Sequence, residues 1–508
     1  MGRENIHVSL SICEDRVVKI NGDVAHKGPC VLYWMTAARR TNYNLSLQHA
    51  IYESLERNLP LIVVEPLSID HDWACNRFHT FIAQGMTNQR MSFQDSNITY
   101  IPYIERKSGD LIKIFDEMLD VCDLVVVDDY PTYIAGDVAR RAEFKQNRCE
   151  THLVDSNGFI GFRTPGRDFT SAYSLRRHLH KTILNHLSAI PLDETIIYSD
   201  KLPKISNAFF EEIREKSGAM NSPFEFMWRI AEGGKTGEQV LQSIDIDHSV
   251  KPISNSIGGQ FSASKIWSKF LKEKLSEYNL NRNHPDMDAT TGLSPWIHFG
   301  HISSQMMIKE ILEKENWSVE NINPPHNGRR SNWWGLSESS EAFLDQMITW
   351  RDLGFIHCYN NPEHHCYNSI PAWARTTLEV HENDTRQYLY TLEELENAQT
   401  HDELWNCAQR QLKQDGVIQN YLRMLWGKKI LEWSPNAEIA FDRMVILNNK
   451  WCLDGRDPNS YTGIGWVCGK FDRGWTEREI YGKVRCMKSK NTQRKVKTEL
   501  YLSKFKAK

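Results

Sequence analysis

The chain has 508 residues, of which 40% are hydrophobic and 25% charged, and its formal net charge is −4. This balance excludes a disordered or fibrous protein, and the length predicts two or three domains with buried cores. No apolar run approaches the roughly 20 residues that span a bilayer, and the eleven cysteines include no CxxC pair. We therefore expect a soluble protein without a membrane partner, in the reducing cytoplasm or nucleus.

The first part of the chain alternates short apolar runs with amphipathic segments. Buried strands are predicted at residues 30–35, 59–67, 98–104, 123–130 and 151–156, with helices such as Leu45–Arg57 and Asp110–Asp120 between them. This alternation predicts a parallel, doubly wound α/β sheet. Neither GxGxxG nor GxxxxGK[ST] follows the first strand, so the standard dinucleotide fingerprint and the P-loop are absent. Asp128 and Asp129 end a strand, and we interpret them as a loop-facing acidic pair rather than as a ligand or metal site.

Beyond residue 206 the apolar spacing changes to the helical period. Helices are predicted at residues 207–216, 262–278, 302–315, 341–353, 402–412 and 417–433. The stretch Leu192–Lys204 carries two prolines and reads as a connector. The predicted organisation is an α/β domain over residues 1–190, a linker over 191–206 and an all-α domain over 207–508. Fourteen of the sixteen tryptophans follow residue 220, which makes the helical domain a candidate for binding a planar ligand.

A turn followed by a helix start is predicted at Thr290-Thr291-Gly292-Leu293-Ser294-Pro295. Ser294 is a suitable N-cap residue and Pro295 a suitable first helical residue. Free amide donors beside small hydroxyls would form an anion site, although plain capping explains the pattern equally well.

Two tryptophans, Trp426 and Trp433, lie seven residues apart in the predicted helix 417–433. This spacing places both indoles on one face, about 10 Å apart along the axis. They could pass an electron toward a buried redox cofactor, but aromatic stripes with helical spacing usually belong to a core.

Other chemistry has weaker support in the sequence. His357-Cys358 and His364-His365-Cys366 suggest metal ligands, but no second ligand pair is evident, and no metal site is predicted. Asp454 and Asp457 lie in a turn whose spacing sets no defined carboxylate separation for a hydrolase. The segment 483–508 carries ten Lys and Arg residues against the single acid Glu499, which is consistent with either a phosphate-facing surface or a solvated tail.

Four segments together resemble the class II cyclobutane pyrimidine dimer (CPD) photolyases of the photolyase/cryptochrome family. They are TTGLSPWIHFGHIS (290–303), THDELWNCAQRQL (400–412), YLRMLWGKKILEW (421–433) and LDGRDPNSYTGIGW (453–466). The resemblance implies an α/β antenna domain followed by an all-helical FAD-binding domain. It also implies a monomer that uses light to split pyrimidine dimers in UV-damaged DNA. The antenna chromophore, a deazaflavin, a folate or none, is left unassigned.

The resemblance assigns cofactor residues in the helical domain. The FAD phosphates would lie near Tyr278 and the turn formed by Thr290, Thr291, Gly292, Leu293 and Ser294. The isoalloxazine would be surrounded by Arg423, Asn448 and Asp454, with the asparagine facing N5 and the arginine paired with the aspartate. The reduced flavin, excited by light, would pass an electron to the dimer, so no general acid or base is required.

The resemblance also assigns an electron relay and a lesion pocket. Trp426 would lie nearest the flavin, Trp405 next and Trp433 at the surface. A flipped-out dimer would be flanked by two indoles and lined by a thioether, while an arginine enters the gap in the duplex. These residues are Trp350, Trp466, Met424 and Arg485, respectively.

Two departures from the family pattern leave alternatives open. Gln346 stands where the family has a glutamate that hydrogen-bonds the dimer, and Lys470-Phe471 stands where a histidine-bearing segment is common. Glutamine keeps hydrogen-bonding capacity but supplies no carboxylic proton. One alternative is therefore a cryptochrome-like photoreceptor that binds FAD without repairing DNA. The other is a (6-4) photoproduct lyase, for which His298 and His301 are the nearest candidate histidines.

Overall fold

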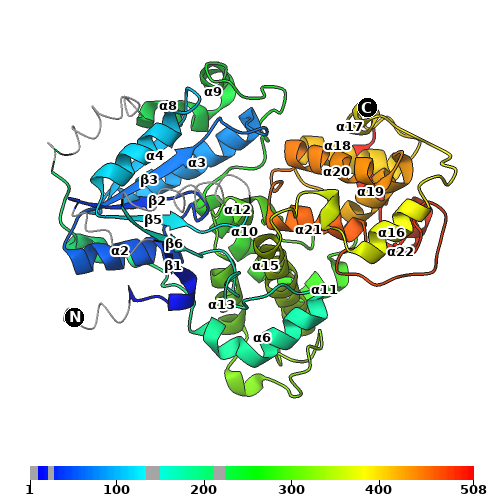
Figure 1. Ribbon diagram of the computed structural model, residues 1–508, viewed down its shortest axis with the longest axis horizontal. Helices are drawn as coiled ribbons and strands as arrows, with labels where there is room; N and C mark the ends of the chain where they lie inside the picture. The colour runs from blue at the N-terminus through cyan, green and yellow to red at the C-terminus, as the bar shows by residue number, and fades with distance from the viewer. Residues whose placement is uncertain (1–9, 21–27, 133–148, 207–208, 210–222, 508) are drawn as a thin grey trace. The chain divides into compact units, whose positions relative to one another are not determined.

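The computed structural model describes residues 10–20, 28–132, 149–206, 209 and 223–507 (Figure 1). The helix expected at 207–216 falls outside these residues, apart from Phe209. The chain forms two compact units, each made of three segments. The first unit comprises Met1–Thr164, Leu184–Trp267 and Leu293–Glu310; the second comprises Pro165–Ile183, Ser268–Gly292 and Ile311–Lys508.

The first unit contains a six-stranded sheet with strand order β1-β6-β5-β2-β3-β4. Its strands are β1 (Val17–Lys19), β2 (Val31–Trp34), β3 (Leu61–Leu67), β4 (Thr99–Ile104), β5 (Leu124–Asp128) and β6 (Glu150–Val154). The five predicted strands are parallel to one another, which confirms the predicted doubly wound class. The short edge strand β1 pairs antiparallel with β6 and was not predicted, because three residues leave no periodic signal.

Alternate residues of the central strands belong to two separate hydrophobic clusters, one on each face of the sheet. Leu32 and Val125 point to the side covered by α4 (Asp110–Val121), whereas Val31 and Leu124 point to the side covered by α2 (Leu45–Arg57) (Figure 1). Strands buried on both faces read as continuous apolar runs, as these strands do. Asn44 begins α2 by accepting a hydrogen bond from the amide of Leu47 (3.0 Å).

A third cluster in the first unit joins the edge of the sheet to three helices. They are α3 (Asn76–Phe93), α8 (Pro223–Glu232) and α9 (Gly234–Leu241), and Ile82, Met86 and Ile230 pack together there. The helix α3 was not predicted, although Phe78, Phe81, Ile82 and Met86 follow the helical period. The described part of the chain contains no sheet strand after β6, in agreement with the predicted change to helices.

The remaining helices include some that overlap the segments predicted at 262–278, 302–315, 341–353, 402–412 and 417–433, together with others that were not predicted. They are α6 (Ala172–Leu187), α10 (Gln260–Glu273), α11 (Tyr278–Asn281), α12 (Ser294–His298), α13 (Ser304–Lys314), α14 (Glu338–Leu344), α15 (Arg351–Asn360), α16 (Ala372–Val380), α17 (Leu392–Glu396), α18 (Glu403–Asp415), α19 (Asn420–Trp433), α20 (Ala437–Trp451), α21 (Pro458–Val467), α22 (Ser489–Lys495) and α23 (Glu499–Phe505). A π-helical turn over Asp345–Trp350 joins α14 to α15. Such turns widen a helix locally and are frequent at functional sites.

Side-chain caps set the limits of the helices that carry the predicted relay. Asp402 accepts a hydrogen bond from the amide of Trp405 (3.1 Å) at the start of α18, and Gly416, with φ 69°, ends that helix. Gln419 caps α19 and Asn436 caps α20 in the same way. These polar residues occur where the apolar period starts or stops, which explains why the helix limits were predictable.

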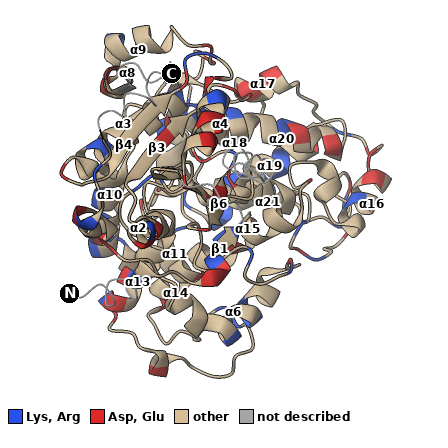
Figure 2. Cartoon of the chain, turned by 60° about the vertical axis from the view of Figure 1, so that its left-hand side comes forward, with Lys and Arg blue, Asp and Glu red and all other residues tan. Residues whose placement is uncertain are grey.

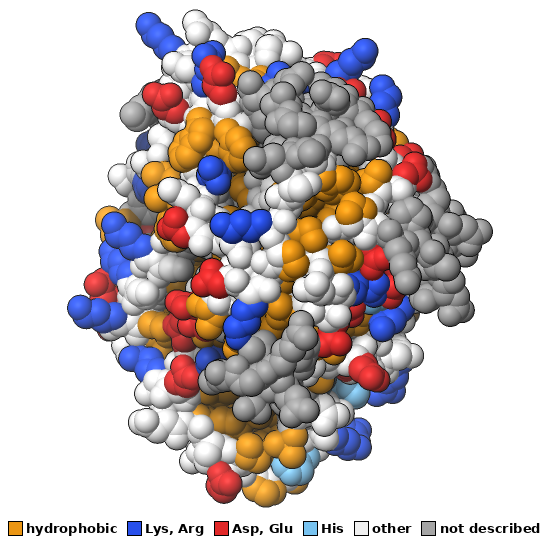
Figure 3. Space-filling model, turned by 90° about the vertical axis from the view of Figure 1, so that its left-hand side faces the viewer, with side chains coloured by type: hydrophobic (Ala, Val, Ile, Leu, Met, Phe, Trp, Pro, Cys, Tyr) orange, Lys and Arg blue, Asp and Glu red, His pale blue; other side chains and the backbone are white. Residues whose placement is uncertain are grey.

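Residues of both charge signs are interspersed along the described helices and loops (Figure 2). The face shown in Figure 3 likewise intersperses Lys and Arg with Asp and Glu, and hydrophobic side chains are exposed between them. Neither view shows a continuous basic field. No helix among the described residues is long and apolar enough to cross a membrane.

Candidate functional site

The polar turn between Trp451 and Trp466 is held by its own charged residues. Arg456, 1% exposed and with φ 64°, donates hydrogen bonds to the carbonyl oxygens of Asn449 and Leu453. Asp457 caps α21 by accepting from the amide of Asn459 (2.8 Å), and Pro458 follows at the first helical position. Since the carboxylate of Asp457 is used in capping, the turn does not present two free carboxylates for hydrolysis.

Arg423 of α19 and Asp454 of the turn form the predicted ion pair, with Nη2 lying 3.1 Å from one carboxylate oxygen and 3.3 Å from the other. The arginine side chain is 30% exposed and the aspartate side chain 10% exposed. Burial lowers the pKa of Arg423, but the attraction of Asp454, together with that of Cys452 and Asp457, outweighs this effect and raises the pKa overall. The pair is therefore a fixed, charged element of the helical unit.

Asn448 and its neighbours form a buried amide network at the end of α20. Asn448 is 4% exposed, and its Nδ2 donates to Oδ1 of Asn449 (3.2 Å). Asn449 in turn donates to the hydroxyl of Tyr461 (3.3 Å) and accepts from the amide of Arg456 (3.0 Å). These hydrogen bonds hold the side-chain amide of Asn448 in place, shortly before Asp454 in the sequence.

The three predicted relay tryptophans come together across α18 and α19. Trp405 Nε1 donates to the carbonyl oxygen of Trp426 (3.0 Å), and its ring lies 5.5 Å from that of Trp433 in an edge-on arrangement. Trp426 Nε1 donates to Oε1 of Gln409 (2.9 Å). The sequence paired Trp426 with Trp433 by helical spacing, and the structure places Trp405 in contact with both.

The expectation that Trp433 lies at the surface is wrong. Its side chain is 2% exposed, because Tyr390 and His401 pack against its ring at 5.4 and 5.3 Å. Tyr388 stacks on His401 at 3.7 Å and is itself exposed. These residues precede α18, and helical spacing within α19 carried no information about them.

Trp350 and Trp466 lie side by side, with ring centroids 4.6 Å apart and planes inclined by 14°. Parallel rings at this distance are in direct stacking contact, so no base fits between them in this conformation. Gln346 precedes Trp350 by one turn of the π-helical segment, and both are half-buried while Met347, Ile348 and Thr349 are buried. Gln346 and Trp350 therefore share the accessible face of this turn.

The acid next to Gln346 is already paired. Asp345 is 5% exposed and binds Arg176 at 3.1 Å, with Arg330 at 3.5 Å from its other oxygen. The two arginines hold the side chain of Asp345 in a fixed position. Asp345 therefore does not replace the glutamate that the family pattern places at residue 346.

The predicted helix start at Ser294 needs a correction. The helix α12 begins at Ser294 itself, Leu293 occupies the N-cap position, and no side chain caps the helix. Gly292, with φ 69°, makes the predicted turn. Thr290 and Thr291 are half-buried, whereas Tyr278 is 7% exposed with its ring against Phe270 and Phe343. The capping argument for an anion site thus fails, and the phosphate assignment depends on the resemblance.

A basic cavity of about 370 Å³ lies at the C-terminal end of the second unit. Its lining includes Tyr421, Trp475, Arg478, Arg485, Lys488 and Lys495. The guanidinium of Arg485 lies over the ring of Trp475 at 5.2 Å, and Met424 is half-buried one helical turn after Tyr421. Four cations with two aromatic rings form a chemically suitable surface for a nucleic-acid backbone.

The suspected His/Cys metal site does not assemble. His357 Nδ1 lies 2.8 Å from Asp168, Cys358 Sγ donates to the carbonyl oxygen of Pro458 at 3.7 Å, and His364 hydrogen-bonds Asn361. His301, suggested for a (6-4) lyase, is 1% exposed in the first unit, where it accepts from the amide of Gly259. Burial lowers the pKa of His301 to about 3, so it is neutral and serves packing.

Lys470, noted as a departure from the family pattern, is hydrogen-bonded to the buried His357, which in turn contacts the half-buried Asp168. Its Nζ lies 2.5 Å from His357 Nε2, and the lysine is 4% exposed. Burial lowers the pKa of Lys470 to about 8, an effect that Cys358 and Asp168 only partly oppose. These contacts were not predictable from the sequence, because the three residues come from distant segments.

The lowered pKa of Lys470 can be tested through the pH dependence of the protein's stability. Between pH 8 and about 10.5 an unfolded chain retains the lysine proton that the folded chain loses, so this group makes stability rise with pH. Relative to Lys470→Met, the wild-type protein is expected to gain up to about 3 kcal/mol over that window. Thermal unfolding midpoints of both proteins at pH 7 and pH 10 measure the difference. The lowered pKa of Lys470 would be contradicted if the unfolding midpoints of the wild type and Lys470→Met changed equally with pH. It would also be contradicted if Lys429→Met differed from the wild type as much as Lys470→Met does.

The polar and aromatic side chains around Arg423, Asn448 and Trp426 are chemically suited to a flavin cofactor. A buried amide, a guanidinium–carboxylate pair and a chain of indoles are groups that can tune and reduce such a cofactor. Arg423, Asn448, Asp454 and Trp426 belong to one helical unit and lie on α19, α20 and the turn that follows.

A scan against protein-family models finds no match. The chain is 28% identical over 493 residues to a deoxyribodipyrimidine photo-lyase of Methanothermobacter thermautotrophicus, covering 97% of this chain and 98% of that protein. It is 38% identical over 253 residues to the deoxyribodipyrimidine photo-lyase of Potorous tridactylus, half of this chain and 44% of that protein. An archaeal photolyase structure from Sulfolobus tokodaii, solved with two FAD molecules, has a TM-score of 0.61 at 13% identity and covers 94% of this chain and 90% of its own.

Proposed function

We propose that this chain, a member of the photolyase/cryptochrome family, is a light-driven DNA lyase that splits cyclobutane pyrimidine dimers. The observation that carries the proposal is the similarity, over nearly its whole length, to a deoxyribodipyrimidine photo-lyase. The four family-like segments between residues 290 and 466 support the proposal that the protein belongs to class II of these lyases. In the same proposal, residues 1–190 form the antenna domain and residues 207–508 the FAD-binding and DNA-binding domain.

The helical unit would hold FAD through the residues that the resemblance assigns. Bound and reduced, FAD supplies the electron that opens the cyclobutane ring when it absorbs light. Asn448 would offer its amide to the ring system, and the Arg423–Asp454 pair supplies a fixed dipole beside it. The phosphates would be bound by Tyr278 and by Thr290, Thr291, Gly292, Leu293 and Ser294. Trp426, Trp405 and Trp433 would return oxidised cofactor to the reduced state.

Lesion binding would require Trp350 and Trp466 to separate. The two rings are stacked with centroids 4.6 Å apart, and a flipped dimer would occupy the space between the separated indoles. Met424 would line this pocket, and Gln346, one turn before Trp350, would donate or accept hydrogen bonds to the bases. Arg485 and the neighbouring lysines would bind the backbone of UV-damaged DNA.

Replacing Trp350 with alanine is expected to weaken dimer binding by about tenfold. Stacking of a base on an aromatic ring contributes about 1–3 kcal/mol. The substitution also removes the indole–indole stacking that stabilises the free protein, which offsets about 0.5–1.5 kcal/mol of this loss. Competition binding in the dark, with dimer-containing and undamaged oligonucleotides, measures the effect. The exposed Trp228 provides the control Trp228→Ala, and equal losses of affinity in both variants would contradict the proposed pocket.

A repair assay on purified protein tests the function. Oligonucleotides with a single thymine dimer are incubated with reduced protein in light and in darkness, and restored thymines are quantified. We expect repair only in light, and flavin photoreduction without repair would instead identify a photoreceptor. A parallel sample with a (6-4) photoproduct is expected to remain unrepaired.

The variant Gln346→Glu tests the departure from the family pattern. We expect faster repair in this variant, because a carboxyl group forms stronger hydrogen bonds to a charged dimer than an amide does. An unchanged rate would mean that the rest of the pocket compensates for glutamine. Asp345→Asn serves as the control for altered charge at the neighbouring position.

A further inference from the structure

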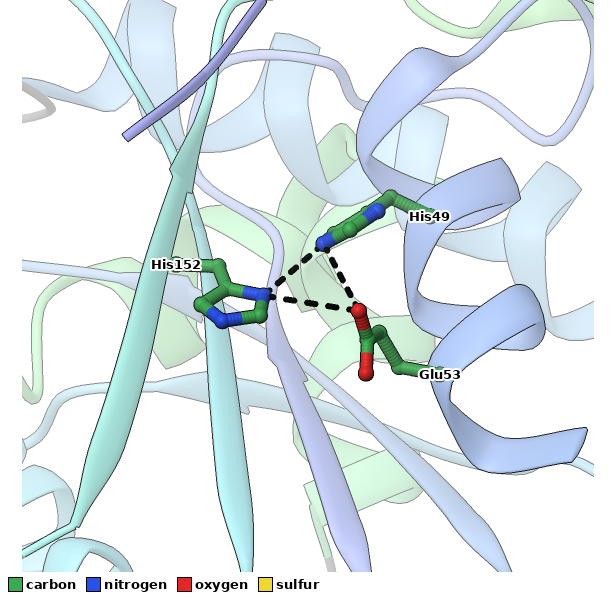
Figure 4. Close-up of side chains that lie close together, drawn as sticks. All are labelled: His49, Glu53 and His152. Atoms are coloured by element: carbon green, nitrogen blue, oxygen red, sulfur yellow. Dashed lines mark hydrogen bonds and ion pairs between the residues drawn. The ribbon is translucent and has the colours of Figure 1, made fainter. Parts of the chain in front are cut away.

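Two histidines and a glutamate that have no part in the proposed function converge in the first unit. His49 and Glu53 lie one turn apart on α2, and His152 projects toward them from β6 (Figure 4). Their exposed fractions are 6%, 8% and 0%. Among the described residues, His49, Glu53 and His152 form a group of possible metal ligands, and their ligand atoms all lie within 4.8 Å of one another.

The ligand atoms form a triangle of the size that a metal ion needs. His49 Nε2 lies 2.9 Å from His152 Nδ1, and Glu53 Oε1 lies 3.6 and 3.8 Å from these two nitrogens. A tetrahedral zinc ion with bonds of about 2.0–2.1 Å separates its ligand atoms by about 3.3–3.4 Å. The three distances bracket this value, so small side-chain shifts suffice to seat an ion.

Outer contacts hold each ligand in the orientation required. His152 Nε2 lies 2.9 Å from Glu150, which keeps a proton on Nε2 and leaves the lone pair of Nδ1 facing the cluster. Arg57 Nε binds the second oxygen of Glu53 at 3.2 Å, so that Oε1 points inward. A carboxylate behind a ligating histidine is the usual second contact of a zinc site.

The local charge also favours a cation. Arg57 is shared by Glu53, Asp123 and Glu150, at 3.2, 2.7 and 2.8 Å. The charge of Lys19 also acts on His49, Glu53 and His152. Three carboxylates against these two cations still leave one negative charge in excess beside the two imidazoles. Without a metal, the same geometry is a hydrogen bond from His49 Nε2 to His152 Nδ1. To bind an ion through Nε2, the neutral imidazole of His49 would carry its proton on Nδ1 instead.

We propose that His49 Nε2, Glu53 Oε1 and His152 Nδ1 bind one zinc ion, with water as the fourth ligand. The donor set of two histidines and one glutamate is suited to Zn²⁺. The ion would tie the helix α2 to the strand β6, and so stabilise the first unit independently of flavin and DNA.

Zinc binding to the full-length protein tests the proposal. Protein stripped with a chelator is titrated with ZnCl₂ against a chromophoric zinc indicator, and bound metal is counted by mass spectrometry. We expect one zinc per chain more in the wild type than in His49→Ala or in the isosteric Glu53→Gln. Because other groups of the chain also bind zinc weakly, this difference between variants is the quantity measured.

Two further variants make the outcome specific. Glu150→Gln is expected to weaken zinc binding by about 10–100-fold, as loss of an outer contact does. Glu56→Gln, an exposed glutamate on the same helix, is expected to leave it unchanged. Flavin content and circular dichroism verify that each variant is folded. Equal zinc binding by the wild type and Glu53→Gln, or an equal loss in Glu56→Gln, would overturn the proposal and leave only a hydrogen-bonded histidine pair.

Discussion

Replacing Trp405 with phenylalanine is expected to abolish photoreduction of oxidised FAD while repair by chemically reduced protein continues. Trp405 contacts both other relay tryptophans, through its hydrogen bond to the carbonyl of Trp426 and its ring contact with Trp433. A phenyl ring is far harder to oxidise than an indole, and electron transfer weakens steeply with distance. Loss of the middle ring therefore separates Trp426 from Trp433.

Flavin absorption during blue illumination, with an external reductant present, measures this effect. The matched control is Trp317→Phe, since Trp317 also lies in the second unit and donates its indole N–H to a tryptophan carbonyl, that of Trp334 (2.6 Å). Both variants lose one hydrogen bond and some volume, but only Trp405→Phe removes a proposed electron carrier. Normal photoreduction by Trp405→Phe would refute the relay.

Replacing Arg423 with methionine is expected to lower the unfolding midpoint of the protein by about 10 °C. Removing one partner of a buried ion pair costs about 3–5 kcal/mol, because the other charge is left without compensation. Because the arginine side chain is 30% exposed, we expect a cost at the lower end of this energy range. For a unit of this size each kcal/mol corresponds to about 2–4 °C.

Thermal unfolding, followed by circular dichroism and by release of flavin fluorescence, measures the loss. Arg410→Met breaks the more exposed pair between Arg410 and Glu403 (2.8 Å) and is expected to cost about 0–1 kcal/mol. The double variant Arg423→Met/Asp454→Asn should recover part of the stability, because it also removes the stranded charge. A single variant as stable as Arg410→Met would show that the pair contributes little.

Much of the fold followed from local patterns in the sequence. The apolar runs that became β2 to β6 and the helical periods that became α18 and α19 depend on neighbouring residues alone, and so could be predicted. The Arg423–Asp454 pair was also predicted, but by resemblance, since nothing local connects residues 31 positions apart.

The burial of individual polar groups was not predictable in this way. The helix α19 buries two lysines, Lys428 and Lys429, and Lys428 Nζ donates to the carbonyl of Val467 (2.6 Å). Burial lowers the pKa of Lys428 to about 8. Long charged side chains bury when a distant carbonyl or carboxylate receives them, and that partner is absent from the local pattern.

From the sequence alone, the strands β2 to β6, the helices α18 and α19 and the residues that resemble a flavin and lesion site could be predicted, whereas β1 and α3 could not. The tertiary structure was needed to see that Trp433 is covered by Tyr390 and His401, that Trp350 and Trp466 stack on each other, and that His49, Glu53 and His152 converge. Periodicity and capping act within a few residues, whereas stacking, ion pairing and ligand geometry depend on side chains that folding brings together from distant segments.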